Sequence, residues 1–464
     1  MSIEENKMGT MPIRPLLLNI SLPIMISMLV QALYNIVDSI FVSQINESAL
    51  TAVSLAFPVQ SLMISVAVGT GVGINALLSR SLGEGDYKKA RITAGNGIFL
   101  AALSYVVFLV LGVVFARDYF EFQTDDALII EYGVSYLVII CIGSLGKFMQ
   151  IVFERLLQST GKSFYSMIAQ GAGAIINIIL DPILIFGYFG MPAMGVAGAA
   201  VATIIGQTVA AMLAIIFNIK VNKEISMKLK SFKPNLGIIG QIYSVGLPSI
   251  VMQSITSVTT YGINNILIRL SSTATAAFGI YFKLQSFVFM PVFGLNNGMV
   301  PIVAYNYGAK QKQRITDTIR LSIKFAFGVM IFGLVLIQLI PDKILLLFNA
   351  SEDMLNIGVP ALRIISLSYI FAGISIVASS VYQALGNGIL SLITAVLRQL
   401  VALLPVAYWL SLSGQVNSVW WSYPIAEVIS FIVSLVFLKY IFDRKVAPLE
   451  SECSYSEDLV ESLQ

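Results

Sequence analysis

The run QSLMISVAVGTGVGINALLSRSLG, residues 60–83, returns in outline as QSFVFMPVFGLNNGMVPIVAYNYG at residues 285–308. Both runs end longer stretches, 22–83 and 247–308, which align without a gap and are identical at ten of 62 positions, a few above chance. The offset of 225 residues pairs Pro23/Pro248, Gln60/Gln285, Gly69/Gly294, Gly73/Gly298, Gly83/Gly308, Gln158/Gln383 and Gly161/Gly386. Because residues that set backbone geometry recur, the sequence predicts two related halves, an arrangement found in many secondary transporters.

Hydrophobic residues make up 57% of the 464-residue chain, charged residues make up 11%, and the mean hydropathy is +0.85. A water-soluble chain of this length cannot bury so much apolar surface, so lipid must be its solvent. Twelve apolar runs reach the roughly 20 residues that a membrane-spanning helix needs. They are 15–43, 51–79, 92–116, 129–153, 163–188, 194–219, 238–268, 275–305, 317–340, 355–381, 388–412 and 416–441. We predict an all-α polytopic membrane protein with twelve transmembrane helices in two pseudo-symmetric six-helix lobes.

Basic residues are distributed unevenly between the predicted loops. With the N-terminus inside, the interior segments hold about 21 of the 28 Lys and Arg residues, and the exterior segments hold about four. Cytoplasmic loops carry an excess of Lys and Arg, so we expect both termini in the cytoplasm of a bacterium and the spans in its cytoplasmic (inner) membrane. The predicted domains are an N-terminal lobe (1–219), a basic cytoplasmic linker (220–237), a C-terminal lobe (238–446) and an acidic, disordered cytoplasmic tail (447–464).

Asp38 and Asp181 lie inside predicted spans, where a charge costs about 2.5–3.5 kcal/mol on insertion scales. Asp38 follows Asn35 by three positions and Asp181 follows Asn177 by four, so each acid shares a helix face with an amide. Pro182, next to Asp181, cannot donate a backbone hydrogen bond and crowds the carbonyl one turn earlier, which leaves a carbonyl near the acid free. Either hydrogen bonds alone satisfy these acids, or the two acids form an ion site.

The oxygen-rich composition of this group favours the ion site. Carboxylate, amide and carbonyl oxygens suit Na⁺, and two neighbouring carboxylates also suit a shared proton. In the second half, the positions aligned with Asp38, Asn177 and Asp181 hold Ile263, Ala402 and Val406. We therefore expect one site for H⁺ or Na⁺, confined to the N-terminal lobe. The chain has no histidine, the commonest ligand of zinc, copper and haem iron, so we expect no cofactor and no metal beyond Na⁺.

Other intramembrane charges give a weaker indication of a functional role. The second half contains Lys283, Arg398 and Glu427; basic side chains of this length can reach the membrane surface, and the acid can simply pair with one of them. Glu154 and Arg155, near the end of a span, are expected to form a local ion pair. The 17 methionines and 11% aromatic residues are compatible with an adaptable cavity for flat apolar ligands and equally with ordinary packing.

Three features resemble the multidrug and toxic compound extrusion (MATE) transporters along nearly the whole chain. They are the twelve spans in two lobes, Ser-Leu-Pro at 21–23 repeated as Gly-Leu-Pro at 246–248, and the run NIILDPILIFG at 177–187. The last run resembles the DinF-like prokaryotic branch, where an aspartate of span 1, an Asn and an Asp of span 5 and a threonine of span 6 belong to the cation site. The resemblance gives these roles to Asp38, Asn177, Asp181 and Thr203.

The resemblance implies a cation-coupled antiporter that exports amphipathic, often cationic drugs and toxic organic compounds by rocking of its lobes. The NorM-like branch also uses acids of the C-terminal lobe, including a glutamate early in span 7, but span 7 here offers only Gln253 and has no acid from Leu247 to Arg269. Residues expected to support the cation site or to line the substrate cavity are Pro23, Tyr34, Asn35, Gln60, Gln253, Lys283, Gln285 and Arg398.

Other functions fit the sequence less well. Related folds flip lipid-linked oligosaccharides, which calls for an arginine-rich cavity, and Arg398 is the clearest of few arginines in spans. An integral-membrane enzyme needs clustered catalytic groups, and a receptor needs a signalling domain. We expect a non-enzymatic transporter that functions as a monomer. Its expected partners are the lipid bilayer and amphipathic small molecules, and not nucleic acid.

Overall fold

The computed structural model describes residues 6–225, 233–348 and 350–449, and over these residues the chain is helical without β-strands. The first half contains α1 (Lys7–Thr10), α2 (Ile13–Ser43), α3 (Glu47–Gly83), α4 (Tyr87–Gln123), α5 (Ala127–Ser159), α6 (Ser163–Phe186), the short η1 (Tyr188–Gly190) and α7 (Val196–Val221). The second half contains α8 (Leu236–Leu270), α9 (Ser272–Gly308), α10 (Lys312–Leu339), α11 (Pro341–Leu346), α12 (Glu352–Ser366), α13 (Tyr369–Ala384), α14 (Gly388–Val396), η3 (Leu397–Leu403), α15 (Leu404–Ser411), α16 (Val416–Val419), α17 (Ser422–Ile441) and η4 (Phe442–Val446).

Eleven continuous helical runs are long and apolar enough to cross a membrane, and α12 with α13, bent by 49° at a short break, make a twelfth. The predicted all-α fold with twelve spans is therefore confirmed. Most of the predicted spans are shorter than the helices, as 92–116 is shorter than α4. Hydropathy reports only the part of a helix that lipid surrounds, whereas the hydrogen-bonded backbone continues beyond it.

Two spans of the second half are irregular. The predicted run 355–381 breaks between α12 and α13, and the run 388–412 contains the π-helical segment η3 (Leu397–Leu403). Pro405 follows this segment, and a proline cannot donate to the carbonyl one turn earlier, which favours a wider turn there. Such π segments are frequent at functional sites, and hydropathy gives no sign of them.

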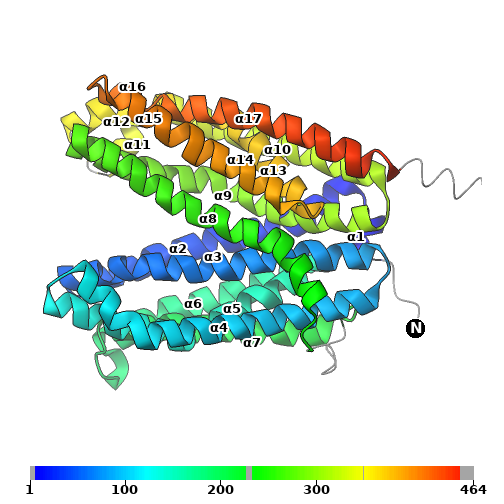
Figure 1. The fold of residues 1–464 in the computed structure, drawn as a ribbon. Helices are drawn as coiled ribbons and strands as arrows, with labels where there is room; N and C mark the ends of the chain where they lie inside the picture. The colour runs from blue at the N-terminus through cyan, green and yellow to red at the C-terminus, as the bar shows by residue number, and fades with distance from the viewer. Residues whose placement is uncertain (1–5, 226–232, 349, 450–464) are drawn as a thin grey trace, which may run out of the picture.

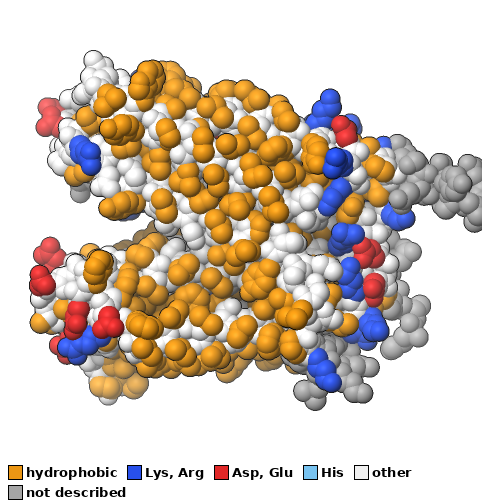
Figure 2. Space-filling model, viewed as in Figure 1, with side chains coloured by type: hydrophobic (Ala, Val, Ile, Leu, Met, Phe, Trp, Pro, Cys, Tyr) orange, Lys and Arg blue, Asp and Glu red, His pale blue; other side chains and the backbone are white. Residues whose placement is uncertain are grey.

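The helices form two bundles. Figure 1 shows α2–α7 in one and α8–α17 in the other; the bundles meet at the end that bears the N-terminus and diverge at the opposite end, where Figure 2 shows a hollow between them. Much of the predicted linker and tail, residues 226–232 and 450–464, lies outside the described residues. We predicted disorder from residue 447, and this is wrong for 447–449, because the chain continues from η4 and packs Leu449, which is 8% exposed.

The repeated glycines lie where helices of the two halves touch. A Cβ atom on Gly73 of α3 would collide with the carbonyl oxygen of Ile242 on α8, and one on Gly298 of α9 would collide with Ser21 on α2. These contacts are equivalent in the repeat, because α3 corresponds to α9 and α8 to α2. Glycine therefore recurs at these positions because only a residue without a side chain allows two helix backbones so close together.

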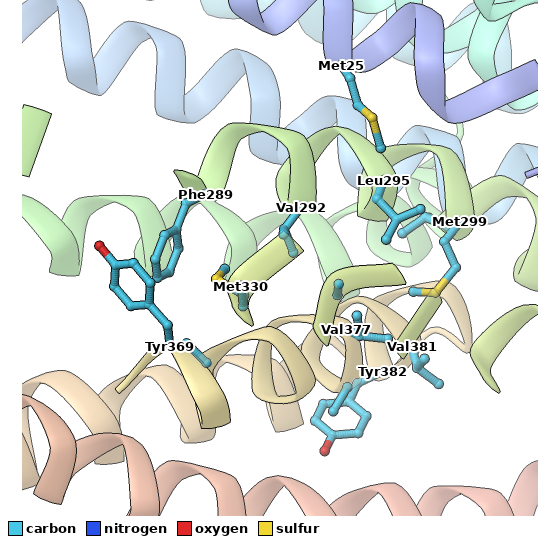
Figure 3. Close-up of a cluster of buried hydrophobic side chains, with 14 of the residues drawn as sticks. Met25, Phe289, Val292, Leu295, Met299, Met330, Tyr369, Val377, Val381 and Tyr382 are labelled. Carbon is cyan, nitrogen blue, oxygen red and sulfur yellow. The ribbon is translucent and has the colours of Figure 1, made fainter. Parts of the chain in front are cut away.

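Apolar packing also joins the halves. The core of the second bundle includes Leu295 and Met299 of α9 with Val377 and Tyr382 of α13, and Met25 of α2 reaches the same cluster from the first half (Figure 3). A separate core fills the first bundle. The first spanning helix is thus packed on both sides, which makes it a structural link between the bundles.

Candidate functional site

Helices α2 and α6 bring the two predicted acids into the interior of the first bundle. Asp181 is fully buried and Asn177 is 2% exposed, on a helix that packs against both α2 and α7. Oδ1 of Asp38 is buried as well. The carboxylates of Asp38 and Asp181 are close enough to interact electrostatically, so the structure brings together two acids that lie 143 positions apart in the sequence.

Asn177 connects this pair to α7. Its Nδ2 donates to Oδ1 of Asp181 at 3.4 Å and to Oγ1 of Thr203 at 3.4 Å. Three oxygens of the group are buried without a partner: Oδ1 of Asp38, Oδ1 of Asn177 and Oδ2 of Asp181. Leaving a buried acceptor unpaired costs about 1–3 kcal/mol, so the arrangement favours binding of a hard cation or a proton among these oxygens.

Two tyrosines extend the site. Tyr34 of α2 and Tyr136 of α5 both lie within electrostatic reach of both acids. Nε2 of Gln60 donates to the hydroxyl of Tyr136 at 2.9 Å, so α3 and α5 also contribute. The sequence predicted Tyr34 and Gln60 as supporting residues but missed Tyr136, whose only signal is a hydroxyl inside a predicted span.

A small polar cavity of about 20 Å³ adjoins the group. Its lining includes Tyr34, Asn177 and Thr203 together with Lys147 and Gln207. A volume of this size holds about one water molecule or an ion of similar size. The last two residues were missed by sequence reasoning, although Lys147 is a charge inside a predicted span and is only 8% exposed.

Other predicted supporting residues lie apart from this group. Asn35 is exposed, and its backbone carbonyl accepts a hydrogen bond from Ser39. Its side chain forms no hydrogen bond with Oδ1 of Asp38, three positions along the helix. Pro23 is buried in the part of α2 that packs against α9, and Gln253 is half-buried on α8.

The charges of the second bundle do not form a second acid pair. Nη1 of Arg398 lies 3.1 Å from Oε1 of Glu427, and both residues line a cavity that also includes Gln285. Lys283 is exposed and is not part of that lining. The repeat equivalent of Asp38 is Ile263, which is 0% exposed in the apolar core.

Glu154 and Arg155 interact electrostatically but do not form the expected direct salt bridge, and each hydrogen-bonds to other side chains. Nη1 of Arg155 donates to Gln158 at 2.9 Å and, across to α9, to Oδ1 of Asn297 at 3.0 Å. Glu154 instead accepts from Gln150 at 2.9 Å. Consecutive residues of a helix do not face each other, so the arginine is free to hold the two bundles together.

A family model, MatE, matches residues 23–183 and again residues 248–409. The chain belongs to the MATE transporter family. The two matches begin at the repeated prolines Pro23 and Pro248, 225 residues apart. This agrees with the duplication seen in the sequence and confirms the family that its motifs resemble. The protein is therefore a multi-pass membrane transporter.

Relatives of this MATE transporter include proteins named multidrug export protein MepA. MepA of Staphylococcus haemolyticus (strain JCSC1435) is 28% identical over 429 residues, which cover 92% of this chain and 94% of the relative. MepA of Staphylococcus aureus (strain MSSA476) is 26% identical over 434 residues, covering 93% and 95%. The similarity therefore extends over nearly the full length of each protein.

Solved structures show the same fold. A crystal structure of MATE in the straight conformation matches with a TM-score of 0.89 at 24% identity, covering 97% of this chain and 100% of that one. An outward-facing conformation of a multidrug resistance MATE family transporter matches with a TM-score of 0.89, also at 24% identity and with the same coverage.

Proposed function

We propose that this MATE transporter exports amphipathic, often cationic drugs and toxic organic compounds in exchange for inward movement of H⁺ or Na⁺. The cation is held among Asp38, Asn177, Asp181 and Thr203 of the first bundle. The observation that carries the proposal is the set of three buried, unpartnered oxygens beside two interacting carboxylates. An empty site of this kind is electrostatically unfavourable, and a bound cation neutralises it.

The distribution of charge supports the orientation. Figure 2 shows Lys and Arg side chains gathered at the end that bears the N-terminus in Figure 1, while the hollow opens at the other end. With the basic end in the cytoplasm of a bacterial inner membrane, the hollow faces outward. We assign this arrangement to the outward-open state, in which drug leaves and the cation enters.

The transport cycle follows from this assignment. Entry of the cation from outside neutralises the carboxylates, and α2, which packs against both bundles, transmits the change to their interface as the two lobes rock. Return to the inward-open state releases the cation and loads another drug molecule. The membrane potential contributes about 2.3 kcal/mol per charge per 100 mV to the inward movement.

Ethidium efflux from vesicles tests the coupling. Vesicles containing the transporter are energised with both a pH gradient and a Na⁺ gradient, and each gradient is collapsed separately with a selective ionophore. Loss of efflux with one ionophore and not the other identifies the coupling ion. Efflux that persists after both gradients are removed would contradict cation coupling. No observation favours the flippase alternative, and the relatives above are named as multidrug export proteins.

A further inference from the structure

The second bundle contains two adjoining cavities, of about 210 Å³ and about 200 Å³. Together they reach the size of pockets that hold drug-like molecules. Phe293, Ile376 and Arg398 line both cavities, so the boundary between them consists of two apolar side chains and one guanidinium. The cation site of the first bundle shares no residue with either of them.

The first cavity is aromatic. Four phenylalanines and a tyrosine line it: Phe278, Phe282, Phe289, Phe293 and Tyr423. Phe282 is 40% exposed and Phe293 is 42% exposed, so these two rings are not fully packed against protein, whereas Phe278 and Phe289 are buried. A cavity lined by this many aromatic rings favours contacts with the face and edge of a planar ring system in a ligand.

The second cavity is lined by many polar side chains, although apolar groups make up most of its surface. Its lining is mostly serine, threonine and amide side chains. Oγ of Ser379, Oγ of Ser430 and both polar atoms of the Asn296 side chain are buried there without a partner. Buried polar groups are usually paired, so this half of the space offers unused hydrogen-bond donors to a ligand.

Arg398 is the charged donor between the two cavities. Its ion pair with Glu427 joins Nη1 to Oε1 at 3.1 Å, and Oε2 of Glu427 is buried without a partner. A guanidinium has five N–H donors and binds a carboxylate best with two parallel hydrogen bonds. The remaining lining residues of both cavities are uncharged, so Glu427 balances the arginine when no ligand is present.

Backbone irregularities place these groups. Arg398 lies on the π-helical segment η3, and Ser368, which also lines the aromatic cavity, lies in the break between α12 and α13. Two irregular segments of the second bundle thus meet at the same cavity, whereas the π-helical η4 (Phe442–Val446) does not contribute to its lining. This coincidence is expected of a binding site and not of a bundle that is only packed for stability.

We propose that these two cavities form a substrate subsite that selects amphipathic molecules with a planar aromatic body and a carboxylate, including zwitterions. The aromatic body occupies the first cavity, and the carboxylate binds Arg398 and the hydroxyl and amide donors of the second. Binding then exchanges part of the Glu427 contact for a contact with the ligand. This inference rests on the proposed export function and names Arg398 as the residue that recognises the acid group of a substrate.

A pair of dyes that differ in one group provides the test. Rhodamine 110 carries a free carboxylate, and rhodamine 123 is its methyl ester, so the two share the aromatic body and differ in the acid. Binding is measured by fluorescence polarisation with the purified full-length protein in lipid nanodiscs. For Arg398→Gln we expect affinity for the acid to fall about 10- to 100-fold, the range for a lost hydrogen bond to a charged group. Affinity for the ester should change less than about threefold.

A second variant acts in the opposite direction. Glu427→Gln leaves the guanidinium uncompensated, so the acid should bind several-fold more tightly while the ester, a cation, should bind more weakly. Arg363→Gln is the matched control, because this arginine is exposed on α12 and lines neither cavity. The ratio of acid to ester affinity is independent of how much protein folds, so partial misfolding cannot mimic the expected result.

The outcomes are separable from those of the proposed function. An unchanged ratio in both Arg398→Gln and Glu427→Gln overturns the subsite, as does a wild-type protein that binds the ester but not the acid. If the ratio of acid to ester affinity shifts as expected but efflux of both dyes does not depend on the pH and Na⁺ gradients, the subsite is supported and the coupled-export proposal fails. If the wild-type protein binds neither dye, the subsite is overturned.

Discussion

Gly83 of α3 and Gly308 of α9 each pack against the backbone of the other's helix, at the end of the molecule that bears the N-terminus. A Cβ atom on the first would collide with the carbonyl oxygen of Tyr305, and one on the second would collide with that of Arg80. The two glycines are equivalent in the repeat, so the contact is reciprocal, as in an interface between two copies related by a twofold axis. The duplication thus closes this end of the molecule.

We expect Gly83→Ala and Gly308→Ala to open this contact. Inserting a methyl group into so close a backbone crossing costs about 1–3 kcal/mol, which shifts the equilibrium between the closed and open end by roughly 5- to 160-fold. Spin labels on α3 and α9 at that end, measured by double electron–electron resonance, should report longer distances. Ethidium efflux should fall.

Gly279→Ala is the matched control for this contact. Gly279 lies on α9 as well, but a Cβ atom there meets nothing within 4 Å. Distances and efflux should therefore match the wild type. Wild-type distances in both Gly83→Ala and Gly308→Ala would show that the glycines do not hold the end closed.

Asp38→Asn and Asp181→Asn should each abolish drug resistance while expression remains normal. Each change keeps the shape of the side chain but removes the charge that a cation neutralises, so coupling is lost and binding of ethidium should stay within about threefold. Asp125→Asn, in an exposed loop, should behave as the wild type. Growth in ethidium and binding by fluorescence are measured together, and wild-type resistance from both mutants would remove the basis of the proposed exchange.

Gln60 and Tyr136 should support cation binding jointly, through the hydrogen bond between them. We expect Gln60→Leu and Tyr136→Phe each to raise the coupling-ion concentration that gives half-maximal transport by about three- to tenfold. The reason is that one buried hydrogen bond contributes about 1 kcal/mol. Transport by the double mutant should be impaired no more than transport by the more strongly impaired single mutant. This result corresponds to a coupling energy of about 1 kcal/mol between the two side chains. Tyr132→Phe, one turn away on α5, is the control. Additive losses in the double mutant would argue against a shared role.

Glu224 should give the transporter a pH-dependent attachment of its N-terminal segment. Asn6 donates to Oε2 of Glu224 at 2.7 Å, and Nζ of Lys162 lies 3.8 Å from Oε1. Burial raises the pKa of Glu224 above its ordinary value of 4.5, against the opposing effect of Lys162 and Asn6. The folded protein therefore holds this proton more tightly than the unfolded chain does.

The sign of the effect follows from the raised pKa. The contribution of Glu224 to stability is fully present below pH 4.5, and it is lost as the pH rises through the folded pKa. The thermal midpoint of the wild type minus that of Glu224→Gln should therefore decrease as the pH is raised across this window. Glu131→Gln, exposed on α5, is the matched surface variant for comparison. A constant difference for Glu224→Gln would refute the assignment.

Sequence reasoning was most successful where the relevant geometry is local. The spacing of Asn177 and Asp181 along one helix correctly gave a shared face, and the two side chains form a hydrogen bond at 3.4 Å. Spacing did not reveal that Asn35 is exposed, nor that Glu154 and Arg155 hydrogen-bond to other side chains. In these cases the identity of the neighbouring helix decides, and spacing along one helix does not contain it.

By itself, the sequence determined the class of the protein, its twelve spans, the duplication and the pair of acids confined to one half. These properties depend on hydropathy and on residues compared along the chain. Only the tertiary structure decided that Tyr136 lies within electrostatic reach of the acids and that Lys147 shares a cavity with Asn177 and Thr203. It also decided that Arg155 reaches Asn297 on the other bundle and that Arg398 lies between two cavities. The physical reason is that helical periodicity fixes which side chains share a face, whereas the packing of whole helices fixes which faces meet.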